Sequence, residues 1–242
     1  MPDVTAAQYA DCGGVATGLV NTGAVSTGVG PTNRLVPYVI NPLTLQTNAY
    51  AASQSPGAGA ITLRAGTGIT AVTVGGATVY QTDVPRNVTI TSGGVDTGIT
   101  FTVTGYDFYG QAMSEAITGA SSTIASGKKA FYQVAVVTHT GSVAGTVIVG
   151  TGDVFGLPFV CADKTQCIGV QWNNTLAKDA GTLTVADTTA TATTTTGDVR
   201  GTYAPSTGAS DGSKQLVFTQ VIKSTQVGSS ATRITVLGVT QA

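Results

Sequence analysis

The chain has 242 residues, of which only 10% are charged, and its formal net charge is −1. Glu115 is the only glutamate, which argues against a helical bundle because long helices draw on Glu, Lys, Arg and Gln. The eleven Lys and Arg residues are scattered, whereas a nucleic-acid binder would carry a basic stripe. Thr, Val and Gly dominate instead, and this composition predicts an all-β fold of short strands joined by glycine turns.

Residues 1–57 are predicted to form an extended N-terminal arm. The start, MPDVTAAQYADCGG, lacks the features of a secretory signal, and no apolar run in the chain is long enough to span a membrane. The stretch GGVATGLVNTGAVSTGVGPTNR is low in complexity, and Pro37 and Pro42 forbid a central strand in the segment that follows. The alternative is a tail that has no fixed structure by itself.

Residues 58–160 are predicted to form a first β-sandwich domain, Ig-like or jelly-roll-like. Short alternating runs such as GITAVTVGG and RNVTITSGG are separated by glycines, and strands that recur every 8 to 12 residues are typical of a sandwich or barrel. The most apolar strand candidate is KKAFYQVAVVTHT. We interpret Lys128 and Lys129 at its start as guards against edge pairing.

Residues 161–242 are predicted to form a second β unit with the strand candidates CIGVQW, GTLTVA, KQLVFTQVI and TRITVLGV. A Thr-, Gly- and Ser-rich insertion at about 186–214 is a candidate contact loop. A flexible surface loop that contacts nothing is an equally weighted alternative. The cysteines, Cys12, Cys161 and Cys167, do not resemble a disulfide framework, and free thiols are expected. Closure of a small loop by Cys161 and Cys167 is the alternative.

No catalytic residue, cofactor site or metal site is predicted. Asp107 follows a strand at a glycine turn, where short acidic residues bond to the backbone, and Glu115 lies in the returning strand. His139 is the only histidine and is interpreted as a packing or surface residue. Cys161 and Cys167 lack the C-x-x-C spacing of a zinc site. A metal held between subunits on a symmetry axis is the remaining alternative.

Aromatic residues crowd the turn that contains Asp107. Tyr106, Phe108 and Tyr109 are candidate contacts for a protein partner, and a sugar-stacking platform is the alternative. Arg200 and Tyr203, which lie in the insertion, are two further candidate contacts. The sequence therefore predicts a protein-contact surface and no catalytic, cofactor or metal site.

The motifs DVPRNVTITSGG, ITFTVTGYDFYGQAMSEAITG, GKKAFYQVAVVT, GTVIVGTGDVFGLP and GDVRGTYAPS…DGSK occur in an order that resembles a class of structural proteins from tailed bacteriophages. The resemblance covers about residues 58–215, and several proteins of this class are capsid cement or decoration proteins. It implies a homotrimer on the capsid exterior that bridges neighbouring major capsid subunits after assembly in the host cytoplasm. It implies no catalytic residues. The alternatives are a head–tail or tail component and a carbohydrate-binding fibre module.

Overall fold

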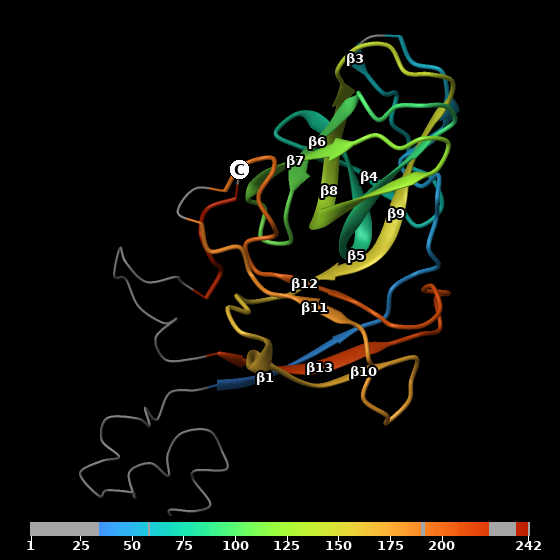
Figure 1. Ribbon diagram of the computed structural model, residues 1–242. Helices are drawn as coiled ribbons and strands as arrows, with labels where there is room; N and C mark the ends of the chain where they lie inside the picture. Colours follow the sequence, from blue (N-terminus) through green and yellow to red (C-terminus); the bar gives the residue numbers. More distant parts are fainter. Residues whose placement is uncertain (1–33, 58, 190–191, 223–235, 242) are drawn as a thin grey trace, which may run out of the picture.

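The computed structural model describes residues 34–57, 59–189, 192–222 and 236–241. These ranges contain no α-helix and one short 3₁₀ turn, η3 (Lys164–Gln166), and all the strand pairs between named strands are antiparallel (Figure 1). The predicted all-β class is confirmed, and the curled antiparallel sheets are sandwich-like.

A ten-stranded sheet forms the main body, with the central order β11-β12-β9-β5-β8-β6-β7 (Figure 1). Its strands are β2 (Ala51–Gln54), β3 (Gly59–Ala60), β4 (Thr70–Val74), β5 (Ala77–Ser92), β6 (Thr100–Tyr106), β7 (Ala112–Thr118), β8 (Ile124–His139), β9 (Val147–Gly156), β11 (Thr182–Thr184) and β12 (Thr202–Ala204). The two longest strands, β5 and β8, have 16 residues each and pair with register shifts. Such irregularities increase twist and bend a strand, so the sheet curls around its own core.

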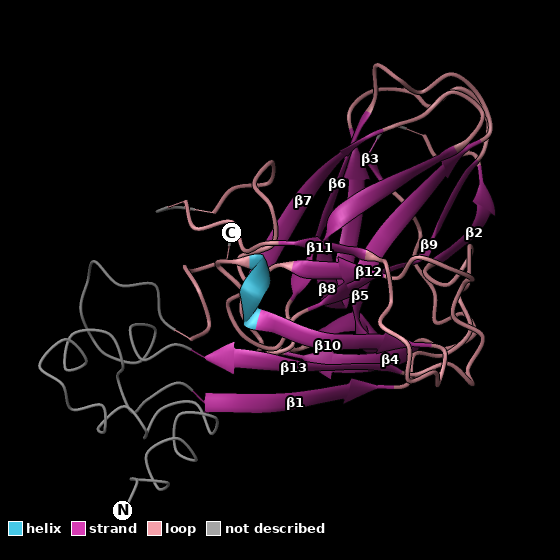
Figure 2. Ribbon diagram, turned by 60° about the horizontal axis from the view of Figure 1, so that its bottom comes forward, coloured by secondary structure: helices cyan, strands magenta, loops and turns pink. Residues whose placement is uncertain are grey.

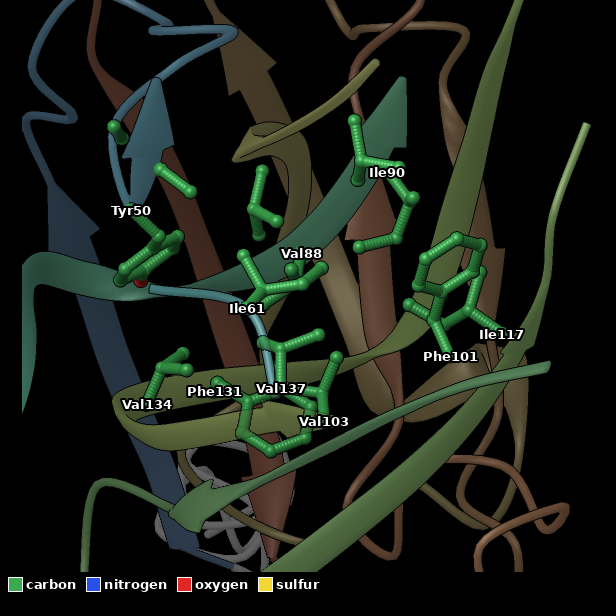
Figure 3. Close-up of a cluster of buried hydrophobic side chains, with 14 of the residues drawn as sticks. Tyr50, Ile61, Val88, Ile90, Phe101, Val103, Ile117, Phe131, Val134 and Val137 are labelled. Atoms are coloured by element: carbon green, nitrogen blue, oxygen red, sulfur yellow. The ribbon is translucent and has the colours of Figure 1, made fainter. Parts of the chain in front are cut away.

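The core of the ten-stranded sheet is made by alternating apolar side chains from its long strands (Figure 3). Ile, Val and Thr fit a pleated surface, and alternate residues of a strand face the same side. The fully buried members of this cluster with aromatic or branched side chains are Tyr50, Val88, Ile90, Phe101, Val103, Phe131, Val134, Val137, Val147 and Val149.

A second, three-stranded sheet has the order β1-β13-β10 and consists of β1 (Arg34–Ile40), β13 (Leu216–Ile222) and β10 (Cys167–Trp172) (Figure 2). Its inner side packs on the end of the ten-stranded sheet. The contact is a second core cluster whose largest members are Phe155, Leu157, Trp172, Tyr203, Leu216 and Phe218. Strand β1 lies at the sheet edge, as Pro37 requires.

Both sheets cross the predicted domain boundaries. Residues 34–57, which the sequence placed in the arm, contain β1 and β2, and Tyr50 among them is fully buried. Strand β1 pairs with β13 near the other end of the chain, and β12 of the second predicted unit pairs with β9 of the first. The low-complexity part of the predicted arm, residues 1–33, lies outside the described residues. The first half of the candidate strand TRITVLGV, residues 232–235, lies outside them too.

The insertion at 186–214 packs against the main body, and it contains strand β12. The amide of Ala116 in β7 donates to the carbonyl of Thr194 at 2.8 Å. The ammonium groups of Lys128 and Lys129 in β8 donate to the carbonyls of Thr195 and Thr193, the latter at 2.7 Å. Strand β6 pairs with β8 only from Gln133 to His139, so on that side of Lys128 and Lys129 there is no partner strand, and the Glu115 carboxylate accepts their amides instead. The two lysine side chains hold the insertion.

Candidate protein-binding surface

The aromatic turn between β6 and β7 is organised by Asp107. One carboxylate oxygen, Oδ1, accepts the amides of Tyr109 and Gln111, both at 2.8 Å. Gly110 adopts φ +78°, a conformation that favours glycine. The predicted turn role of Asp107 is confirmed.

The other carboxylate oxygen of Asp107 binds the insertion. Arg200 Nη1 lies 2.9 Å from Asp107 Oδ2, and both side chains are buried. The guanidinium also lies over the ring of Tyr109, 5.1 Å from its centroid, and the Tyr109 hydroxyl donates to the carbonyl of Pro158 at 2.7 Å. Burial raises the pKa of Tyr109, although Arg200 opposes the shift. The turn and the insertion are thus fixed to each other by a buried ion pair.

The predicted contact residues divide into surface and interior positions. Phe108 is 54% exposed, Tyr109 is partly exposed, and Tyr106 is half-buried in β6. Arg200 and Tyr203 are buried, so their prediction as surface contacts is corrected. Their polar groups are used inside the chain: Arg200 binds Asp107, and the Tyr203 hydroxyl donates to Asp179 Oδ2 at 2.6 Å. Both residues were predicted contacts as members of the insertion, and the sequence of the insertion gave no sign of their burial.

A pocket of about 250 Å³ opens beside this turn, between β1 and the end of the ten-stranded sheet. Phe108 and Arg200 belong to its wall, and the rest of the lining is mostly apolar: Tyr38, Val39, Ile40, Asp83, Val84, Pro85, Ala130, Gly156, Leu157 and Pro158. The two charged lining groups already have partners in the chain. Arg200 pairs with Asp107, and Asp83 lies 3.8 Å from Arg86.

The three-stranded sheet leaves its other side exposed, and this side is mostly apolar. We call it the outer face. Leu35, Val39 and Ile168 are between 45% and 51% exposed. The pairing register places residues of all three strands on this face: Leu35, Pro37, Val39, Ile168, Gln171, Val217, Thr219 and Val221. The exposed Lys178, which bridges to Gln171, lies at its border. The sequence did not predict this face, because residues 34–40 were assigned to the arm. The signal in the sequence was the two-residue alternation of KQLVFTQVI, which gives this strand a second apolar face once β1 pairs beside it.

The groups considered for chemistry have structural partners. Glu115 is buried and accepts the amides of Lys128 at 2.6 Å and Lys129 at 3.2 Å, and burial raises the pKa of its carboxyl. Glu115 therefore supports β8, and Asp107 supports the turn. His139 packs against Phe101 with its Nδ1 2.8 Å from the carbonyl of Gly141, in agreement with a packing role.

Cys161 and Cys167 lie close together as thiols. Their sulfur atoms are 3.4 Å apart, a hydrogen-bond distance and not that of a disulfide, which is about 2.05 Å. Cys161 also donates to the carbonyl of Asp163 at 3.3 Å. The hydrogen bond in which the Cys167 thiol donates to Cys161 raises the pKa of Cys167, and burial raises it further. The third cysteine, Cys12, lies outside the described residues.

Among the residues described, no group of three or more His, Cys, Asp or Glu side chains is arranged to hold a metal ion. The same residues include no helix that is long and apolar enough to cross a membrane. Comparisons with models of protein families, with curated proteins and with solved structures found no match to the chain.

Proposed function

We propose that this protein is a structural component of a tailed-bacteriophage virion, a capsid cement or decoration protein that holds neighbouring major capsid subunits together. The outer face is the observation that carries the proposal. A mostly apolar patch with charge only at its border is typical of a surface that another protein covers, because charged residues are depleted at the centres of interfaces. Leu35, Val39 and Ile168 supply the exposed side chains of this patch.

Cement activity would follow from burial of this face against the shell. Apolar area contributes about 25 cal/mol per Å² removed from water, so one small patch gives a weak contact. A homotrimer presents three such patches, and each later contact then forms at a high effective concentration. The proposal therefore combines self-association with binding to the major capsid protein on the capsid exterior.

The rigid attachment of the insertion supports such a role. The buried pair Arg200–Asp107 and the Lys129–Thr193 hydrogen bond keep the body behind the binding surface in one conformation. A preformed surface loses less conformational entropy on binding than a flexible one. The proposed binding to a capsid would therefore cost little conformational entropy, because the body of the free chain is already held in one conformation.

The test is the number of copies in purified phage particles that carry this gene, measured by quantitative mass spectrometry. Hundreds of copies per particle support a cement protein, a dozen or fewer indicate a head–tail or tail component, and absence from particles contradicts the proposal. Ile168→Asp should reduce the copy number by placing a charge on the outer face. Val95→Asp is the matched control, because Val95 is 65% exposed and lies outside the three-stranded sheet.

A carbohydrate-binding fibre module is the second candidate, and the exposed ring of Phe108 is the observation that favours it. Sugar-stacking sites need open aromatic faces with polar groups beside them. The Tyr109 ring is instead stacked on Arg200, and its hydroxyl is bound to Pro158. A glycan array tests this candidate: binding that is lost in Phe108→Ala would favour it over the cement role.

A further inference from the structure

The turn that follows β10 projects from the body and carries one almost fully exposed leucine (Figure 1). Leu176 is 92% exposed, the highest value among the exposed large hydrophobic side chains of the described residues. A single exposed leucine is common, but one at the tip of a projection can enter a cavity on another molecule without a change in the backbone.

This turn is held in one shape by its own bonds. Asn173 and Asn174 have φ values of 64° and 57°, a conformation that asparagine tolerates in turns. The Asn174 side chain donates to the carbonyl of Ser213 at 2.9 Å, and Gln171 Nε2 donates to the carbonyl of Leu176 at 3.3 Å. The leucine is therefore presented in a fixed position, which lowers the entropic cost of burying it.

The pocket beside the aromatic turn suits an apolar side chain. Its volume of about 250 Å³ lies below the range of about 300 to 1,000 Å³ of small-molecule sites. Val84 and Leu157 contribute to its apolar wall, and its charged groups, Asp83 and Arg200, are already paired within the chain. A neutral side chain can enter the pocket while Asp83 and Arg200 both keep their partners. A charged group would find no unpaired opposite charge in the lining.

We propose that Leu176 of one copy inserts into this pocket on a second copy of the chain. The pocket lies at the β1 edge of the three-stranded sheet, and the projecting turn follows β10, the opposite edge strand. The contact joins two different surfaces, so it is heterologous and generates a closed ring, such as a trimer, or an open filament. This inference concerns self-association and does not depend on whether the protein binds a capsid.

Sedimentation velocity over a range of concentrations tests the proposal on the full chain. Leu176→Ala should weaken self-association about tenfold and Leu176→Asp about 100-fold, because burial of the leucine is lost and a charge is placed in an apolar pocket. Val39→Trp should block the pocket from its rim and weaken association similarly. Val95→Asp, which removes an exposed apolar side chain elsewhere, should leave association unchanged.

Mixing the two interface variants separates this contact from any other. Leu176→Asp keeps the pocket and Val39→Trp keeps the leucine, so an equimolar mixture should form one-to-one dimers and nothing larger. A wild type that stays monomeric overturns the proposal, as does association that persists in Leu176→Asp or a mixture that stays monomeric. Near-ultraviolet circular dichroism of each variant confirms the native fold, which the exposed positions of both residues should leave intact.

Discussion

The two sheets of this molecule use the same apolar residue types for opposite purposes. The ten-stranded sheet curls around its own core, so residues such as Phe131 and Val103 are fully buried by the chain itself. The three-stranded sheet buries Phe218 and Leu216 on one side and leaves Leu35 exposed on the other. Strand alternation alone does not show which apolar face is core and which is interface. The difference lies in whether the chain supplies a covering layer.

Loss of a core side chain in the ten-stranded sheet should have the largest effect. Phe131→Ala is expected to lower the free energy of unfolding by about 4 kcal/mol, because it removes a fully buried ring and leaves a cavity. Urea denaturation followed by fluorescence measures this change. A loss below about 1 kcal/mol would show that the core of this sheet is not closely packed.

Loss of the Arg200–Asp107 ion pair should have the second-largest effect on stability. Arg200→Met is expected to cost about 3 kcal/mol, since it leaves the buried carboxylate of Asp107 without its cationic partner. The value lies at the low end for a buried pair because Asp107 keeps two backbone donors. Thermal unfolding and hydrogen exchange of the insertion measure it. Unchanged protection of residues 192–204 would contradict the anchoring role. Lys164→Met is the control, because Lys164 is exposed and lies outside the insertion.

The pH dependence of stability should reveal the burial of Glu115. Its pKa is raised by burial, so the native state keeps a proton that the unfolded state has lost at pH values just above the ordinary pKa. The stabilisation is complete below the unfolded-state pKa and is lost as the pH rises through the native one. Glu115→Gln should make the free energy of unfolding fall less steeply between pH 4 and 8, measured by urea denaturation at each pH. An unchanged slope would show that other groups cause the fall.

A substitution on the outer face should have the smallest effect on stability. Ile168→Ser is expected to change the free energy of unfolding by no more than about 0.5 kcal/mol, because the side chain is about half exposed and has no covering layer. The same denaturation assay as for Phe131→Ala measures it. A loss of 2 kcal/mol or more would place this residue in a core and remove the contrast between the sheets.

Local features were predictable from the sequence, and distant pairings were not. The β class, the turn at Asp107 and the edge position forced by Pro37 depend on neighbouring residues, whose preferences are visible in a short window. The pairing of β1 with β13 joins segments about 180 residues apart, and nothing in either strand specifies its partner. For the same reason, the burial of Arg200 against Asp107, 93 residues away, could not be read from the insertion itself.

The two lysines of β8 hold the insertion through main-chain carbonyls and not through side chains. Every residue type has such a carbonyl, so these bonds do not require threonine at positions 193 and 195. The hydroxyls of the run act within it instead: the Thr196 hydroxyl accepts the Thr193 amide at 3.0 Å and donates to the Thr193 carbonyl at 2.8 Å. The choice of side chains in this run is therefore set by its own turn and not by the lysines. Lys128 and Lys129, by contrast, have little freedom to vary.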